Sequence, residues 1–467
     1  MTGAATAEPA RGESGAARWR EPHFVLAAAA GFVLVCEAVT QEVGTSAPML
    51  LAAAVAFAAF ILVWREQERL RLLPLLGLTL VFQLAWIAVH LGVGLESFDS
   101  QILYSRWGNE LLDGRYPEAQ YPPGAVLLFA LEAWLGGGAT RTSNAFVMIP
   151  FHLATVAAVW AVRTRVTPWL AALVALWPLN AFFWEFRFDL VPTAFLAVGL
   201  VLALRGCWGL SGAVLGLGAA VKWIPGLAFA FLAVWLLASR RTSDLWRHAA
   251  AFVAVFVGLH LPFLVWSPDE ATYTYRYFSG QGITGESAWY LLLDPLGLAT
   301  VNEREFWLPA DVPGWADPLA VAVQAVLLLA LVIAVLRVRG RVEPAIAIAA
   351  MAPVVFLLTN RIFSPQYLVP LLAAWAIAGA VLLESRRHQL ALGVAAMAAT
   401  TANSFVYPYT LQELGLWKVA SAAHFAVGLA TTAWIVRLSL DVESQEPNRY
   451  PDSPGRWLGT EKEPTEP

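Results

Sequence analysis

The chain has 467 residues, of which 58% are hydrophobic and 14% are charged, and its formal net charge is −4. Roughly a quarter of the residues in soluble proteins are charged, so this composition excludes an ordinary soluble globular protein. Apolar runs of roughly 17–25 residues, each long enough to cross a bilayer, recur along almost the whole chain. Because these runs are continuously apolar rather than alternating, they predict transmembrane helices and not a barrel.

The predicted organisation is one polytopic membrane domain between two tails. Residues 1–21 are rich in Ala, Gly, Glu and Arg, residues 441–467 are polar and rich in Pro, and both are expected to be disordered. The first apolar run follows a long polar lead and precedes further spans, so it is expected to be an uncleaved span. The membrane domain then covers residues 22–440.

We expect an all-α fold with about fourteen spans, because that many apolar runs approach the length of a membrane crossing. The expected spans are 23–41, 47–64, 71–95, 144–163, 168–182, 190–205, 209–224, 225–238, 247–266, 318–336, 343–358, 364–383, 389–406 and 416–438. A further apolar run, 123–135, is short and carries Glu132. It is expected to dip into the outer face of the membrane or to lie along it.

Clustered basic residues indicate which loops face the cytoplasm. The clusters lie in the short loops 65–71, 163–165, 240–247, 337–341 and 385–388. All of them share one side only if segment 123–135 does not cross. Both tails are then cytoplasmic, while a first outer loop, 96–143, and a long outer loop, 267–317, face outward together with the shorter outer turns.

The first outer loop begins with an aspartate next to the bilayer. After Phe98, apolar residues recur at Ile102, Leu103, Trp107 and Leu111, which predicts an amphipathic helix lying flat on the outer face. Gly114 suits the left-handed position that ends such a helix. Asp99 then has two interpretations: a cap of this helix, or a general base placed where a lipid-borne substrate meets an aqueous one.

Two later segments predict polar walls of a cavity. The run YPPG (121–124) forms a rigid elbow after Tyr121, because two prolines fix the backbone and remove two donors. In the run 182–192, Glu185, Arg187 and Asp189 alternate with aromatic residues. These residues are either an interfacial aromatic belt or a second polar wall of the same cavity.

Cations also occur on the outer side. Lys222 is expected within an otherwise apolar helix, where it either snorkels to the headgroups or faces a lipid phosphate. In the turn 360–367, Arg361 and Gln366 bring donors to the outer face next to Tyr367. The long outer loop is dense in Tyr and Trp and carries Arg276 and Glu286, which suits either a sugar-binding surface or an interfacial belt.

Several reaction classes have no visible site. There is no Walker loop, dinucleotide fingerprint, His-x-x-x-His pair or nucleophile elbow in a fitting context. The two cysteines, Cys36 and Cys207, lie in or beside apolar runs and are expected to be small apolar side chains in the membrane. No cofactor, metal or nucleic-acid partner is therefore expected.

The motifs, in their order along the chain, resemble those of glycosyltransferase family 87. They are an aspartate after an early span, LLDGRYP followed by YPPG, RFDLVP, GLGAAVKWIPG and FSPQYLVPLL, and they cover roughly residues 75–385. The resemblance implies a GT-C type membrane enzyme. Many such enzymes are bacterial α-mannosyltransferases that use polyprenyl-phosphate-mannose.

The resemblance also implies roles for particular residues. Asp99 would be the catalytic base, and Lys222, with Arg187 or Arg361, would bind the phosphate of a polyprenyl-phosphate sugar on the outer membrane face. The substrate cavity would be lined by Tyr121, Asp189, Gln366, Tyr367, Arg276 and Glu286. Relatives often carry a basic residue shortly before a Glu-Ser pair, whereas Arg276 and Glu286 are separated here by a longer, glycine-containing stretch.

The implied function is inverting transfer of a hexose, expected to be mannose, to a glycan or glycolipid acceptor. Arabinose or glucose are alternative donor sugars. A transporter or flippase of lipid-linked sugars is the main alternative of another class; it would place polar groups near the bilayer midplane and show two related halves. A non-catalytic membrane assembly partner is the third.

Overall fold

The computed structural model describes residues 21–95, 97–162, 167–302, 305, 307–409 and 416–441. Within these residues the regular secondary structure is helical, and two isolated bridges, Thr284 with Pro309 and Thr300 with Asp311, join parts of the long loop. The expected all-α class is confirmed for this part of the chain. The basic cluster 163–165 and nearly all of both tails lie outside the described residues.

Nine helical segments in the described residues are long and apolar enough to cross a bilayer. They are α2 (Pro22–Val43), α3 (Ala47–Arg65), α4 (Leu72–Gly92), α7 (Arg141–Trp160), α13 (Thr242–Trp266), α17 (Ala316–Arg337), α18 (Val342–Thr359), η5 (Pro365–Tyr367) continued by α19 (Leu368–Leu382), and α21 (Trp417–Asp441). A tenth span is possible if α8 (Thr167–Leu176) and the segment formed by η3 (Pro178–Asn180) and α9 (Ala181–Phe186), bent by 43° from it, count as one crossing.

The remaining helices are shorter or more polar. They are η1 (Gln67–Arg69), η2 (Asp99–Leu103), α5 (Tyr104–Leu112), α6 (Pro123–Leu135), α10 (Leu190–Leu204), α11 (Trp208–Val221), α12 (Ile224–Ala238), α14 (Pro268–Ala271), α15 (Tyr273–Gly280), α16 (Ala288–Leu293), η4 (Asp294–Leu296) and α20 (Arg386–Ser404).

The expected count of fourteen spans is not confirmed, although every expected span is at least partly helical. The helices α10, α11 and α12 have only 15, 14 and 15 residues. Helix α20 begins with two arginines and a histidine and ends in the polar run TTANS, and it is not among the candidate spans. Most residues of α10 are buried against neighbouring helices, whereas α11 and α12 keep exposed apolar residues such as Leu210 and Leu237.

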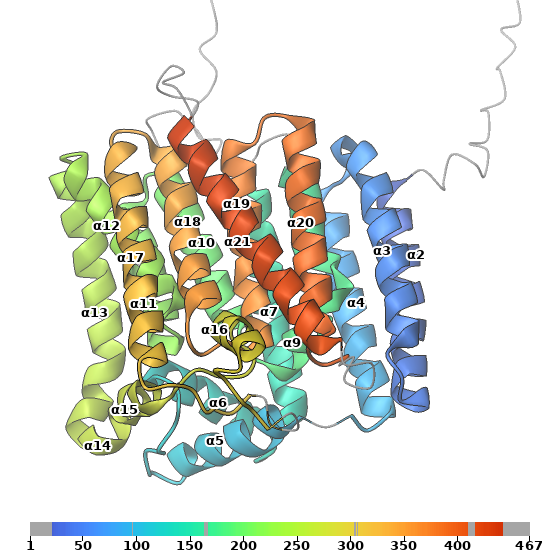
Figure 1. Cartoon of the computed structure of the whole chain (residues 1–467), viewed down its shortest axis with the longest axis horizontal. Coiled ribbons are helices and arrows are strands. Elements are labelled where there is room, and N and C mark those ends of the chain that lie inside the picture. Colours follow the sequence, from blue (N-terminus) through green and yellow to red (C-terminus); the bar gives the residue numbers. More distant parts are fainter. Residues whose placement is uncertain are drawn as a thin grey trace, which may run out of the picture.

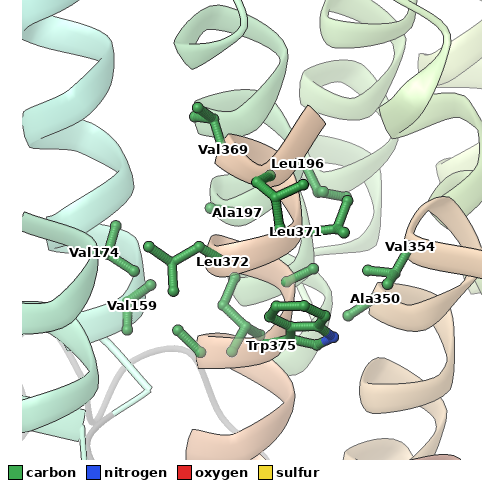
Figure 2. Packing of buried hydrophobic residues seen from close by; sticks show 14 of the residues in the cluster. Val159, Val174, Leu196, Ala197, Ala350, Val354, Val369, Leu371, Leu372 and Trp375 are labelled. Carbon is green, nitrogen blue, oxygen red and sulfur yellow. The ribbon is translucent and has the colours of Figure 1, made fainter. Parts of the chain in front are cut away.

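The interior is centred on α18 and α19. Every residue of α19 from Leu368 to Ala380 is buried, as expected for a helix that is apolar on all sides. Figure 2 shows Leu372 and Trp375 of α19, with Val159 and Val174 on one side and Ala350 and Val354 on the other. The many alanines in α18 and α19 let these helices approach closely, which is how helices associate in a bilayer.

The two ends of the bundle differ in what they carry. Helices α5, α6, α14 and α15 gather at one end, the lower end in Figure 1. The connections α3–α4, α12–α13, α17–α18 and α19–α20 lie at the opposite end. There an Arg386 nitrogen lies 3.0 Å from a Glu68 carboxylate oxygen, and the Gly340 N–H donates to the Ser239 hydroxyl over 3.0 Å. The described basic loops therefore share one end.

The amphipathic helix after Phe98 is present, and of its expected apolar stripe Trp107 is buried while Leu103 and Leu111 pack against the core. Tyr104, Trp107 and Gly108 are buried, whereas Ile102 is exposed. The helix begins with the π-helical turn η2, whose wider turn changes which side chains face the bundle. Helix α5 ends at Leu112, and Gly114 adopts the expected left-handed conformation with φ 78°.

Candidate active site

Asp99 and Arg187 form an ion pair at the α5–α6 end of the bundle. Asp99 is the first residue of η2, Arg187 follows the end of α9 in an extended conformation, and their side chains are 26% and 13% exposed. The cap position before η2 is Phe98, and no side-chain capping bond is recorded there. The structure therefore gives the Asp99 carboxylate a cation as its partner and offers no support for the interpretation as a helix cap.

Lys222 lies beside this pair. It was expected within a helix, but the structure places it between two helices. It is an extended residue, with φ −157° and ψ 136°, between the end of α11 and the start of α12. An interrupted helix suits a cation here, because the extended residue turns its side chain away from lipid and toward protein partners. Lys222 Nζ donates to Asp189 Oδ1 over 2.6 Å.

Aromatic rings surround the Lys222 ammonium. Its nitrogen lies 5.0 Å from the ring centres of Phe188 and Tyr367 and 5.7 Å from that of Tyr121. Rings at this distance stabilise a cation through the negative charge on their faces. The other carboxylate oxygen of Asp189, Oδ2, is buried and has no hydrogen-bond partner within the described structure.

Two glycines allow the helices to bring these residues together. A Cβ on Gly124, at the start of α6, would lie 2.5 Å from the carbonyl oxygen of Ala220, close to the end of α11. A Cβ on Gly108 of α5 would lie 2.3 Å from the carbonyl oxygen of Phe129 in α6. Only glycine permits these approaches, and they place the predicted proline elbow, with Tyr121, against Lys222.

Glu286 supplies a further carboxyl group near Arg187. It is 6% exposed and immediately precedes Ser287, whose hydroxyl accepts the Tyr290 N–H at the start of α16. Burial raises the pKa of Glu286 to about 8, although the positive charge of Arg187 opposes the rise. Burial also lowers the pKa of Arg187, and Tyr407, Asp189 and Glu286 oppose that change. Glu286 is thus a neutral acid near pH 7, able to donate a hydrogen bond.

The pKa of Glu286 predicts how stability depends on pH. The unfolded carboxyl ionises near its ordinary value of 4.5 and the folded one near 8, so between these values the folded chain holds one more proton. Stability should therefore fall as pH rises from about 5 to about 8, by up to about 1.4 kcal/mol per pH unit from this group. Glu286→Gln should flatten that part of the Tm-versus-pH curve of the purified protein. Parallel curves for wild type and variant would contradict the assignment.

Three expected site residues are not brought to this cluster. Arg276 is more than half-exposed and contacts Asp269 and Thr272. Arg361 lies 3.7 Å from Asp317 and donates to carbonyl groups of the long loop. Gln366 is buried and accepts from the Ser364 hydroxyl over 2.5 Å. Arg361 supports the loop that carries Glu286, since its own carbonyl accepts the Thr284 N–H.

Sequence reasoning did not identify a second group of buried charges next to the site. Glu37 and His90, both in spans, contact each other, and His90 also contacts Glu185. The available signal was a titratable side chain inside an apolar run, which is rare unless it is paired or functional. Among the described residues, no group of three or more His, Cys, Asp or Glu side chains is placed to hold a metal ion.

Fold and site together define an all-α, multi-pass membrane protein with a carboxylate–cation site at one end of its helix bundle. The family model of glycosyltransferase family 87 matches residues 119–365, more than half of the chain. The chain belongs to this family and is a glycosyltransferase. None of the curated proteins and none of the solved structures compared with the chain matches it.

The matched range is narrower than the resemblance drawn from the motifs. It contains Arg187, Asp189, Lys222 and Glu286, and it begins after Asp99. Membership of a glycosyltransferase family supports an enzyme over the transporter and the non-catalytic partner that the sequence left as alternatives.

Proposed function

We propose that this glycosyltransferase moves a hexose, expected to be mannose, from a polyprenyl-phosphate donor to a glycan or glycolipid acceptor, with inversion at the anomeric carbon. The proposal depends on one observation: two ion pairs, Asp99 with Arg187 and Lys222 with Asp189, lie at one end of the bundle. Such a site offers one base and two cations. Inverting displacement of a phosphate needs these groups and no covalent intermediate.

In the proposed reaction, Asp99 accepts the proton of an acceptor hydroxyl. The hydroxyl oxygen forms a bond to the anomeric carbon, and the bond from that carbon to the phosphate oxygen breaks. Its electron pair leaves with the lipid phosphate, whose charge Lys222 and Arg187 offset. Tyr121 and Tyr367, which flank Lys222, supply ring faces against which a sugar packs.

The ion pairs also indicate how the donor prepares the base. Without substrate, Arg187 is engaged with Asp99 and Lys222 with Asp189. A donor phosphate that takes Arg187 as its partner releases the Asp99 carboxylate, since a guanidinium binds phosphate and carboxylate with the same donors. The base then becomes available when the donor is bound.

We also propose the topology in which the site faces outward and both termini are cytoplasmic. The membrane domain over 22–440 is then flanked by two cytoplasmic tails. This proposal is supported by the described basic loops, which lie at the end opposite the site, because basic loops remain in the cytoplasm. Reaction of a membrane-impermeant thiol reagent in intact cells with Asp113→Cys in a Cys36→Ala, Cys207→Ala background would test it. Labelling of that cysteine only after lysis would contradict the outward orientation.

The transfer itself is tested in membranes that contain the protein. Radiolabelled polyprenyl-phosphate-mannose is supplied with extracted acceptors, and membranes without the protein serve as control. Protein-dependent appearance of label in the acceptor fraction is expected. Transfer from polyprenyl-phosphate-arabinose or polyprenyl-phosphate-glucose alone would correct the sugar, and transfer from none of the three would overturn the proposed donor.

We expect transfer to survive removal of divalent metal ions. A lipid monophosphate carries a modest charge, which Lys222 and Arg187 are placed to offset without a metal. Activity in excess chelator should equal that in magnesium within assay error. Complete loss in chelator, restored by a divalent ion, would contradict this expectation.

A further inference from the structure

A buried network of charged groups includes Glu185, two residues before Arg187 of the candidate site. His90 of α4 contacts Glu185 of α9 through Nδ1, and its Nε2 lies 2.8 Å from Glu37 Oε1 of α2. The hydroxyl of Tyr409 donates to Glu37 Oε2 over 2.7 Å, and an Arg141 nitrogen of α7 lies 3.5 Å from Glu185 Oε1. The His90 and Glu37 side chains are fully buried, and the Glu185 side chain is almost so.

The contacts determine how many protons the three central groups hold. Each nitrogen of the His90 ring faces a carboxylate oxygen, so each of the two contacts requires one proton between its partners. The group Glu37–His90–Glu185 therefore holds two protons, and its net charge is −1. Arg141 beside Glu185 brings the buried total to zero, which is the condition for keeping such groups away from water.

This network is joined to both partners of the Asp99–Arg187 ion pair. On one side, Glu185 precedes Arg187 by two residues, and the Asn144 amide donates to the Glu185 carbonyl over 2.5 Å. On the other side, the start of α7 binds the segment around Asp99. Arg141 Nε donates to the Leu95 carbonyl over 3.0 Å, and the hydroxyl of Thr140 donates to the carbonyl of Ser100.

We propose that Glu185, held between His90 and Arg141, is a positioning residue that places Arg187 against Asp99; this rests on the function proposed above. The start of α7 binds the backbone of both segments, and the network fixes where Glu185 lies relative to α2, α4 and α7. A buried ion-pair network seldom adds stability over well-packed apolar residues. A contribution to geometry at the adjacent site accounts for keeping four charged groups inside the bundle.

The first test is His90→Gln, which keeps polar contacts but removes one shared proton and leaves a carboxylate charge unbalanced. We expect kcat for transfer to fall by about a hundredfold, because a small misplacement of reacting groups has an effect of this size. The donor KM should rise much less than kcat falls, because Lys222 keeps its partner Asp189 and still binds the donor phosphate. His248→Gln is the matched control: His248 is also a fully buried histidine in a span, bonded to the Trp208 carbonyl in another part of the bundle.

The double variant Glu37→Gln/His90→Gln tests whether the loss of kcat comes from the unbalanced buried charge that displaces Glu185 or from lost packing around His90. It removes the unbalanced charge while leaving Glu185 with Arg141, so kcat should recover about tenfold relative to the single variant. If His90→Gln does not accumulate, Arg141→Lys keeps the charge but loses the Nε contact to Leu95, and the same loss of kcat is expected. A wild-type kcat in His90→Gln, or a double variant no better than the single one, would overturn the proposal.

Hydrogen exchange supplies a readout that needs no activity. Amides of residues 187–193 and 97–104 should exchange faster in His90→Gln than in wild type, with no such change in His248→Gln. Unchanged exchange in both segments would overturn the positioning role even if activity fell. If wild type transfers no sugar from any donor, the proposed function fails, while the exchange result still decides whether the network places the two segments.

Discussion

Replacing Asp99 by asparagine is expected to lower kcat for sugar transfer by about a hundredfold to ten-thousandfold, the usual contribution of a general base. Asparagine has nearly the same shape but cannot accept the proton of the acceptor hydroxyl. Donor binding should persist, because Arg187 loses a competing anion when the Asp99 charge is removed. The measurement is transfer in membranes with matched amounts of wild type and variant.

The matched control for Asp99 is Asp113→Asn. Asp113 follows α5 on the same loop, is exposed and lies 3.8 Å from Arg115, so its loss should leave transfer unchanged. Equal transfer by wild type and Asp99→Asn would remove Asp99 from the chemistry. Asp189 and Glu286 would then be the next candidates, since both lie near Arg187.

Replacing Lys222 by methionine is expected to reduce transfer by about a hundredfold to a thousandfold, the effect of removing one group that stabilises developing charge. The same change leaves the buried Asp189 carboxylate unpaired, which costs about 3–5 kcal/mol of stability. Lys222→Met/Asp189→Asn removes both charges and should recover stability without recovering transfer. Recovery of transfer in the double variant would show that Lys222 acts only as the structural partner of Asp189.

Lys418→Met provides a close control for Lys222. Its ammonium lies 2.8 Å from Asp294 and faces the rings of Tyr290 and Trp417 at 5.4 and 5.6 Å, a local environment like that of Lys222. It lies outside the cluster around Asp99 and Arg187. Unaffected transfer in Lys418→Met, measured with Lys222→Met in one assay, would tie the loss to the position of the cation.

Residue patterns predicted the candidate site unevenly. Lys222, Arg187 and Asp189 are recognisable because charged side chains are rare in apolar runs, and the structure brings them together with Asp99. Arg276 and Arg361 carry the same signal, a cation on the predicted outer side, yet their partners are Asp269 and Asp317. Sequence spacing does not distinguish the two cases, because ion pairs form between loops whose relative positions depend on helix packing.

The sequence by itself determined that this protein is a helical membrane protein. Backbone N–H and C=O groups in a bilayer must bond to each other, which a long, continuously apolar segment achieves as a helix. It also indicated where most candidate site residues lie, in the segments between the apolar runs or at the ends of those runs. Only the tertiary structure decided that Lys222 ends a helix, that Arg187 pairs with Asp99, and that Glu37, His90 and Glu185 form one network. These contacts join residues far apart in the chain, so they follow from how α2, α4, α7, α9 and α11 pack and not from any local pattern.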